Sequence, residues 1–312
     1  MINLEHVSFG YIKQPMLFLD VSLKIDNGNV FVFGQEGSGK TSLLELLCGM
    51  QTLYVGKIQV FKKLPQDSTL NITYLPVDVV ALKSKTVLQN LQYACDAINK
   101  DYSIIDLEDD FIKQFGNIKL KKLSNFNKAI FALKRAKIKD AKVLLIDINL
   151  TGFSDQEITQ YSQMLNELLK DNNKVVIVAV CAEDYKKLEL DMNNSQIAYL
   201  FATKMYQFKN LSDFKNSLNF MGMADYLPFN KYDATVNVSQ SGNYLKVLDK
   251  TIKLEDKYIQ NIAEYFDDTT TSTKVKIYTN LSLDSLSDKD FNNCLNEQSV
   301  LIYDSLTTQK LN

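Results

Sequence analysis

An eight-residue glycine loop constrains the fold of this chain more than any other sequence feature. Residues 34–41 read Gly-Gln-Glu-Gly-Ser-Gly-Lys-Thr and match the pattern G-x-x-x-x-G-K-[ST] in full. A short apolar run at 30–33 precedes the loop, and leucines at 43, 44, 46 and 47 follow it with helical spacing. The sequence therefore predicts a strand, a phosphate-binding loop and a helix in direct succession.

The residue types in this loop suit a nucleotide triphosphate. Glycines let backbone N–H groups curl around phosphate oxygens without Cβ clashes, and the helix that follows directs its positive end at them. Lys40 is expected to reach the β- and γ-phosphates, and the Thr41 hydroxyl to bind Mg²⁺. The chain has only 11 glycines, which makes a chance match rare. The residues expected to bind nucleotide here are Gly34, Gly37, Ser38, Gly39, Lys40, Thr41 and Ser42.

The remaining pattern predicts an α/β domain followed by a smaller β-rich one. Continuous apolar runs at 143–146 and 175–180 are typical of parallel strands covered on both faces. Helical patterns at 128–139 and 155–169 alternate with them, which favours a mainly parallel sheet. After about residue 220 the chain changes to short β-like segments at 234–238, 244–248, 274–279 and 300–303. We expect domains at 1–220 and 228–312.

Composition excludes several classes of function. The formal net charge is −2, so no bulk attraction to nucleic acid or to an anionic membrane is expected. The start has no basic stretch followed by a long apolar run, and the apolar run at 175–181 is too short to span a bilayer, so any membrane role needs a partner. The four cysteines form no CxxC pair, and His6 is the single histidine. Asn-Lys-Tyr-Asp at 230–233 looks like a guanine-binding motif, but it lies outside the predicted α/β domain.

Beyond the loop, the order of segments resembles the ATP-binding-cassette (ABC) family through the first 220 residues. Val7-Ser8-Phe9-Gly10-Tyr11 is similar to the family's opening strand and its adenine-stacking aromatic residue. Residues 72–78 and 86–91 resemble the Q-loop stretch, and Leu123-Ser124-Asn125-Phe126-Asn127 stands where the family has LSGGQ. Residues 140–147 end in the Walker B aspartate, Asp147, and 174–180 resemble the strand before the switch histidine.

The resemblance implies a P-loop fold that binds MgATP. Tyr11 would stack on adenine, although it could instead be an edge-strand aromatic residue. Thr41 and Asp147 would hold Mg²⁺. Ser124 would contact a phosphate across a dimer, or else only cap a helix. The implied partners are a membrane permease and a second ABC subunit, with the chain in the cytoplasm on the inner face of the membrane.

The tail narrows the resemblance to one branch of the family. Segments at 206–208, 212–214, 219–220 and 301–307 resemble the region after the cassette in sugar-importer ATPases, including their small OB/TOBE-like regulatory domain. The alternative is an unrelated β appendage.

The chain departs from the family at the positions that carry hydrolysis. Ile148 stands where the family has the glutamate that polarises the attacking water, and an aliphatic side chain cannot accept a proton. Cys181 occupies the switch-histidine position and Val77 the Q-loop glutamine position. Asn125 and Phe126 replace the signature glycines, and Phe126 is expected to obstruct a facing subunit. We therefore expect slow or absent hydrolysis. The alternatives are a working ATPase that uses unorthodox residues, or a regulatory scaffold whose ATP site is structural.

Overall fold

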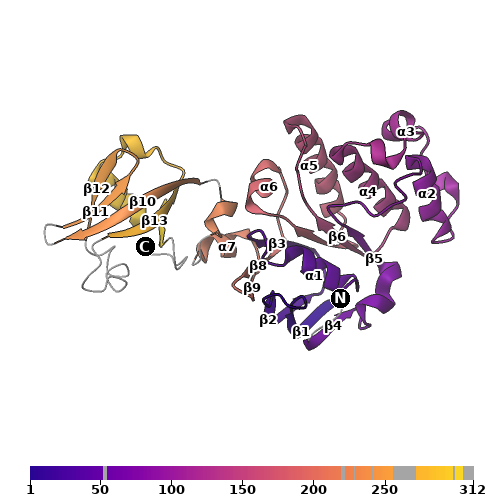
Figure 1. Ribbon diagram of the computed structural model, residues 1–312, viewed down its shortest axis with the longest axis horizontal. Coiled ribbons are helices and arrows are strands. Elements are labelled where there is room, and N and C mark those ends of the chain that lie inside the picture. The colour runs from indigo at the N-terminus through magenta and orange to yellow at the C-terminus, as the bar shows by residue number, and fades with distance from the viewer. Residues whose placement is uncertain are drawn as a thin grey trace. The chain divides into compact units, whose positions relative to one another are not determined.

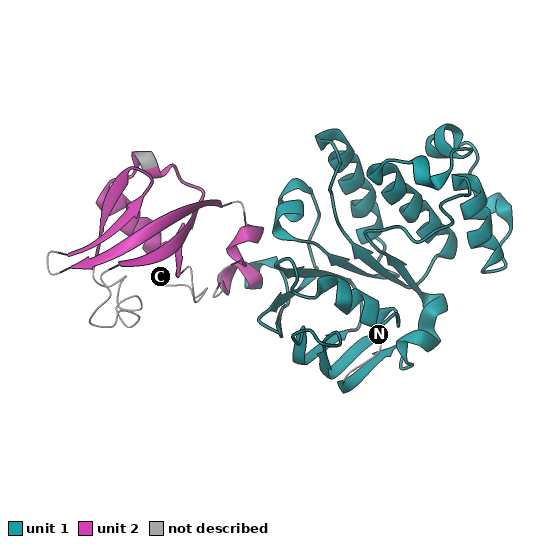
Figure 2. Cartoon of the chain, viewed as in Figure 1, with its two compact units in different colours: residues 1–213 teal, residues 214–312 magenta. Residues whose placement is uncertain are grey.

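The computed structural model describes residues 1–51, 55–218, 222–227, 229–239, 242–255, 272–297 and 299–304. The chain forms two compact units, Met1–Asp213 and Phe214–Asn312 (Figure 2). The expected domain limits at 220 and 228 lie outside the described residues, as do 219–220 and 305–307 of the tail motifs. The division into a cassette at 1–220 and a regulatory domain at 228–312 stays a prediction.

A six-stranded sheet forms the centre of the first unit, in the order β5-β6-β7-β3-β8-β9. The pairs β5–β6, β6–β7, β7–β3 and β3–β8 are parallel, and β9 is antiparallel to β8. This confirms the predicted α/β class with a mainly parallel sheet. The strands are β3 (Asn29–Gly34), β5 (Ile72–Leu75), β6 (Val143–Asp147), β7 (Val175–Ala179), β8 (Gln196–Phe201) and β9 (Lys204–Phe208).

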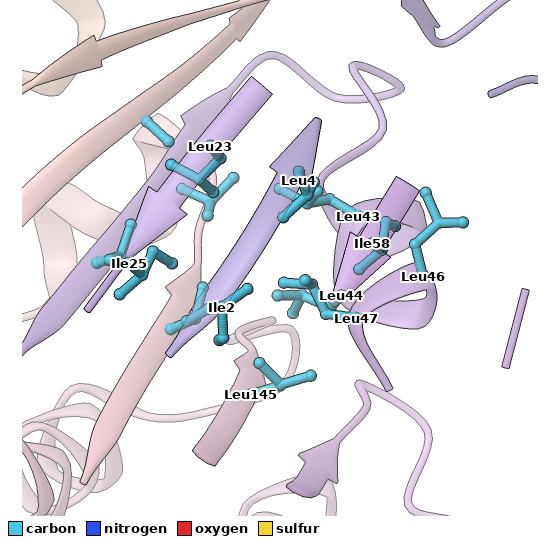
Figure 3. Packing of buried hydrophobic residues seen from close by; sticks show 14 of the residues in the cluster. Ile2, Leu4, Leu23, Ile25, Leu43, Leu44, Leu46, Leu47, Ile58 and Leu145 are labelled. Carbon is cyan, nitrogen blue, oxygen red and sulfur yellow. The ribbon is translucent and has the colours of Figure 1, made fainter. Parts of the chain in front are cut away.

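A second sheet in this unit is antiparallel, with the order β2-β1-β4. Its strands are β1 (Ile2–Phe9), β2 (Phe18–Ile25) and β4 (Val55–Val60). Helix α1 (Lys40–Leu47) packs between the two sheets, with four leucines in one core with Ile2 and Leu4 of β1 and Leu145 of β6 (Figure 3). Because α1 is apolar toward both sheets, packing on both sides holds the helix and, with it, the end of the glycine loop at the buried Gly39.

The other helices of the first unit are α2 (Val87–Asp96), α3 (Asp110–Phe115), α4 (Asn125–Lys139), α5 (Asp155–Leu169), α6 (Ala182–Lys187) and α7 (Leu211–Asn216), which runs across the boundary. Figure 1 shows α4 and α5 on the face of the main sheet opposite α1. Local sequence explains where two of them begin. Thr86 with Gln89, and Ser154 with Glu157, form capping boxes that satisfy the first backbone N–H groups of α2 and α5.

The second unit is a five-stranded antiparallel sheet in the order β12-β11-β10-β13-β14, with α9 (Asp288–Asn296) packed on it. Its core includes Val236, Ile277 and Phe291. The predicted β-rich character is confirmed, and the guanine-like motif at 230–233 is simply the start of β10. The strands are β10 (Asn230–Ser239), β11 (Gly242–Val247), β12 (Lys250–Leu254), β13 (Ser272–Thr279) and β14 (Val300–Asp304).

Candidate nucleotide site

The glycine loop joins the carboxyl end of β3 to the first turn of α1, as the sequence predicts. Gly37 and Gly39 have φ angles of 77° and 95°, in the left-handed region that side chains disfavour. Gly39 has a second constraint, because a Cβ there would come within 2.9 Å of the Phe18 ring. The loop conformation that presents backbone N–H groups to a phosphate therefore depends on glycine at these positions.

Lys40 is folded back over this loop. Its Nζ donates hydrogen bonds to the backbone oxygens of Gly34, at 2.8 Å, and of Gln35, at 2.9 Å. Burial lowers the pKa of Lys40, while the neighbouring Cys181 and Asp147 act to raise it. A partly desolvated ammonium group held only by neutral carbonyls at hydrogen-bond range is a strong anion binder, because a phosphate offers it full charge compensation.

Thr41 and Asp147 meet although they are 106 residues apart in sequence. The Thr41 hydroxyl donates a 2.6 Å hydrogen bond to the Asp147 carboxylate. Asp147 is the last residue of β6, and β6 pairs with β7, the strand next to β3. Burial raises the pKa of Asp147, against the opposing effects of the Thr41 hydrogen bond and the Lys40 charge. The described residues contain no cluster of three or more His, Cys, Asp or Glu side chains, so the protein offers a cation mainly these two oxygens. Such a sparse donor set suits Mg²⁺, which keeps water and phosphate ligands.

One buried polar atom in the loop lacks a partner. The Ser38 hydroxyl oxygen is buried and has no hydrogen-bond partner in the structure. It lies so close to Gly34 that a Cβ there would be 2.4 Å from it. An unsatisfied buried hydroxyl is costly, and a phosphate oxygen in the loop would satisfy it. The loop therefore fits a nucleotide triphosphate on its own geometry.

Tyr11 lies near this site, where its side chain already contacts other residues of the chain. Its hydroxyl is 3.0 Å from the Ser42 hydroxyl and donates to the Glu45 carboxylate at 3.3 Å. Its ring meets Phe9 edge-on, at 5.2 Å between centroids. The buried Ser42 hydroxyl is thus already paired with the Tyr11 hydroxyl. Adenine stacking by Tyr11 stays a prediction.

The positions expected to carry hydrolysis are apolar or weakly polar in the folded chain. Ile148 follows Asp147 directly and is 5% exposed. Val77 is half exposed, on the segment after β5. Cys181 occupies the N-cap position of α6 and lies near Lys40. Burial raises the pKa of the Cys181 thiol, so it is neither a base nor a cation at neutral pH.

The signature-like segment differs from the sequence expectation in one respect. Ser124 caps α4, since its hydroxyl accepts a hydrogen bond from the Asn127 N–H at 3.1 Å. Phe126, however, is buried, with its ring edge-on to Phe153 at 5.5 Å. The prediction that Phe126 obstructs a facing subunit is therefore wrong, because the first turn of α4 directs this side chain into the chain's own aromatic cluster.

Sequence reasoning missed a pocket next to Asp147. Its lining includes Val77, Asn125, Asp147, Asn149, Thr151 and Tyr161. Asn125 donates to the Thr151 backbone oxygen at 3.2 Å, and Asn149 accepts from the Thr151 N–H at 2.8 Å. The signal was available, because Asn149 comes just after the carboxyl end of a parallel strand, where ligands bind in α/β sheets.

Comparisons with known proteins agree with this geometry. Residues 18–148 match the family profile described as ABC transporter. The molybdate import ATP-binding protein MolC of Haemophilus influenzae is 23% identical over 184 residues, covering 56% of this chain and 71% of MolC. The spermidine/putrescine import ATP-binding protein PotA of Fusobacterium nucleatum is 22% identical over 290 residues, covering 82% of this chain and 73% of PotA. That coverage extends beyond the first unit, which is 213 of the 312 residues.

Solved structures show the same fold. The ATP binding subunit of an ABC transporter superposes with a TM-score of 0.57 at 16% identity, covering 69% of this chain and 92% of that one. A dimeric ATP-binding cassette bound to ADP and phosphate gives a TM-score of 0.55 at 19% identity, covering 67% and 98%.

The fold and the loop together define a P-loop nucleotide-binding protein. The first unit carries an ATP-binding-cassette domain, matched over residues 18–148, of the kind found in ABC ATPase subunits. The likeness of its tail to sugar importers stays a prediction, since MolC and PotA serve molybdate and polyamines.

Proposed function

We propose that this chain is the ATP-binding subunit of an ABC transporter and binds MgATP with slow or absent hydrolysis. One observation carries the proposal. A complete phosphate loop and a Thr41–Asp147 pair lie directly beside Ile148, a buried aliphatic side chain where a general base would be needed.

The proposed MgATP binding rests on one set of groups suited to an anion and one pair of oxygens suited to a cation. The loop N–H groups, the Ser38 hydroxyl and the Lys40 ammonium would hold the phosphates, and Thr41 with Asp147 would hold Mg²⁺. Tyr11 would pack against adenine. Bound MgATP would supply the binding energy that favours a closed assembly of subunits.

The hydrolytic half of the proposal rests on missing proton acceptors. Glu157, an acid soon after β6, accepts hydrogen bonds from the Ser154 N–H at 2.8 Å and the Ser154 hydroxyl at 3.1 Å, so it serves as a helix cap. A positioned general base typically contributes about 10²–10⁴-fold to the rate of a reaction. Without one at residue 148, we expect turnover far below that of ordinary enzymes.

The proposed partners are a membrane permease and a second ABC subunit. The helices in the described part of the chain include none long and apolar enough to cross a bilayer. The relatives MolC and PotA are ATP-binding proteins of import systems, and one structural neighbour is part of an ABC transporter complex. By analogy, we propose that this chain acts in an importer, on the cytoplasmic face of the membrane, through its permease.

The test is thermal unfolding of the full chain with and without MgATP. A ligand that binds only the native state raises the melting temperature by mass action, so MgATP should raise it and adenosine alone should raise it far less. Copurification from native membranes tests the partners. A melting temperature that MgATP leaves unchanged at millimolar concentration would contradict the binding proposal.

A further inference from the structure

One acidic residue stands inside the phosphate-binding loop itself. Glu36 is the third residue of the loop, between Gln35 and Gly37. It is exposed, and its carboxylate forms no ion pair or hydrogen bond with the described part of the chain. Its place is unexpected on electrostatic grounds, because the ligand proposed for this loop is an anion and like charges repel.

A tight turn fixes the backbone of Glu36. The Ser38 N–H donates to the Gln35 backbone oxygen at 3.2 Å, which closes a four-residue turn over 35–38. Glu36 and Gly37 occupy the two central positions, and Gly37 has the positive φ angle, 77°, that a type II turn requires at its third residue. The carboxylate can therefore move only as far as its own side chain allows, and it stays beside the loop.

The same turn holds the cation of the loop. The Gln35 backbone oxygen that accepts from Ser38 also accepts the 2.9 Å hydrogen bond from Lys40 Nζ. Glu36 is the next residue along the chain, so its backbone begins at the carbonyl group that binds the ammonium. Burial lowers the pKa of Lys40, and Glu36 is one of the side chains that act to raise it. The Glu36 carboxylate therefore lies within electrostatic range of the Lys40 ammonium group.

The turn lies where the outer phosphates of a nucleotide are expected. The lysine of a P-loop reaches the β- and γ-phosphates, and the metal ion in such sites bridges the same two groups. A γ-phosphate bound to Lys40 would therefore lie next to the turn that carries Glu36. A diphosphate has no group at this place. Of the charges on bound ATP, those of the third phosphate are the ones that the Glu36 carboxylate would oppose most.

We propose that Glu36 is a specificity-determining residue that opposes the third phosphate, so that the site prefers MgATP over MgADP only weakly. This inference rests on the proposed binding of MgATP. The Lys40 ammonium and the unpartnered Ser38 hydroxyl both favour the ligand with more phosphate oxygens, and the Glu36 carboxylate offsets part of that preference. The site would then stay occupied whichever of the two nucleotides is present.

The test is isothermal titration of the full chain with MgATP and with MgADP, for the wild type and for Glu36→Gln. At low salt, the variant should bind MgATP about fivefold more tightly, which is the effect of removing one like-charge pair about 4 Å apart in water. Its affinity for MgADP should change less than about twofold. At about 1 M salt, where the Debye length is about 3 Å, the gain for MgATP should also fall below about twofold. Tripolyphosphate and pyrophosphate, which have no base, should show the same contrast.

Two further variants separate the charge of Glu36 from its place in the turn. Glu36→Asp keeps a carboxylate, so its ratio of MgATP to MgADP affinity should stay within about twofold of the wild type. Glu167→Gln removes the same charge from an exposed position near the end of α5 and should change neither affinity. This end of α5 is far from the loop, because its Leu169 accepts from Asn29 at the opposite end of β3.

The outcomes distinguish this inference from the proposed function. If both nucleotides bind and Glu36→Gln leaves the ratio of their affinities unchanged, Glu36 does not discriminate between them and the inference is wrong. Equal gains for MgATP and MgADP would overturn it too, because they would indicate a general change in the loop. If the wild type binds neither nucleotide, the proposed function fails and the inference fails with it.

Discussion

Two neighbouring parts of one site are built from different chemistry. After β3, the chain gathers loop N–H groups, the unpartnered Ser38 hydroxyl and the Lys40 ammonium around a space suited to phosphate. After β6, the residue that follows Asp147 is the buried Ile148. Val77 and Cys181 stand where the family has two further polar groups, the Q-loop glutamine and the switch histidine. The same sheet edge supports both parts, so the fold alone does not explain the difference. Under the proposed function, binding of the nucleotide and its hydrolysis would depend on separate side chains, so that the first could be kept without the second.

The largest effect on ATP affinity is expected from removing the positive charge of the phosphate-binding part. Lys40→Ala deletes the ammonium group, and hydrogen bonds to charged groups contribute about 1.5–3 kcal/mol each, so ATP affinity should fall by at least about 100-fold. Isothermal titration measures it. The control is Cys181→Ala, which removes a neighbour of Lys40 on the other part and should change affinity less than about threefold. Equal loss in both variants would mean that the two parts are not separable.

A second prediction concerns the loop backbone. Gly39→Ala adds a Cβ that is both in the left-handed region and 2.9 Å from the Phe18 ring, whereas Gly37→Ala adds one in open space. We expect Gly39→Ala to lower the free energy of unfolding by about 2–3 kcal/mol and Gly37→Ala by about 1–2 kcal/mol. Urea denaturation of the nucleotide-free chain measures both. The order would be contradicted if Gly37→Ala were the more damaging change.

A third prediction sharpens the role of Tyr11. If its ring packs on adenine, Tyr11→Ala should weaken ATP binding by about 1 kcal/mol, the scale of an aromatic contact. Inorganic triphosphate, which has no base, should bind as before. Tyr11→Phe keeps the ring but loses the contacts to Ser42 and Glu45, and so should bind ATP almost normally. A parallel loss for ATP and triphosphate would show that Tyr11 is only structural.

The smallest effect is expected from the carboxylate that the two parts share. Burial raises the pKa of Asp147, so its charged form opposes folding at pH values above the ordinary aspartate range. Asp147→Asn removes that charge and should raise the melting temperature of the nucleotide-free chain slightly at neutral pH. The gain should shrink as the pH falls and the wild-type carboxyl becomes protonated in both states. The same variant should lose the Mg²⁺ dependence of ATP binding, and a lower melting temperature at neutral pH would contradict this account.

Much of the first unit could be predicted because its signals are local. The apolar run before Gly34 and the leucines after Lys40 correctly indicate β3 and α1, and Ser154 with Glu157 marks the start of α5. In the second unit the sequence did not indicate α9, because Asp288–Asn296 has many polar residues and only a few apolar ones, such as Phe291 and Leu295, to bury.

The candidate site was predictable where a side chain belongs to a sequence motif that resembles one of the family. The contact between Thr41 and Asp147 was expected from family order. The inward direction of Phe126 was not, because it depends on Phe153 and Tyr161, which meet it only through tertiary packing. The orphaned Ser38 hydroxyl likewise depends on the close approach of Gly34.

The measurement that tests the central claim most directly is single-turnover ATP hydrolysis by the wild type and by Ile148→Glu, with Lys40→Ala as the background. We expect the wild type to match the background. Ile148→Glu should stay near it, because the new carboxylate would enter a buried position and because Val77 and Cys181 leave the water and the γ-phosphate without two polar partners; residues that act as a unit are strongly non-additive. Wild-type turnover of about 1 per second, within the ordinary enzyme range, would contradict the account, as would a large rescue by the single substitution.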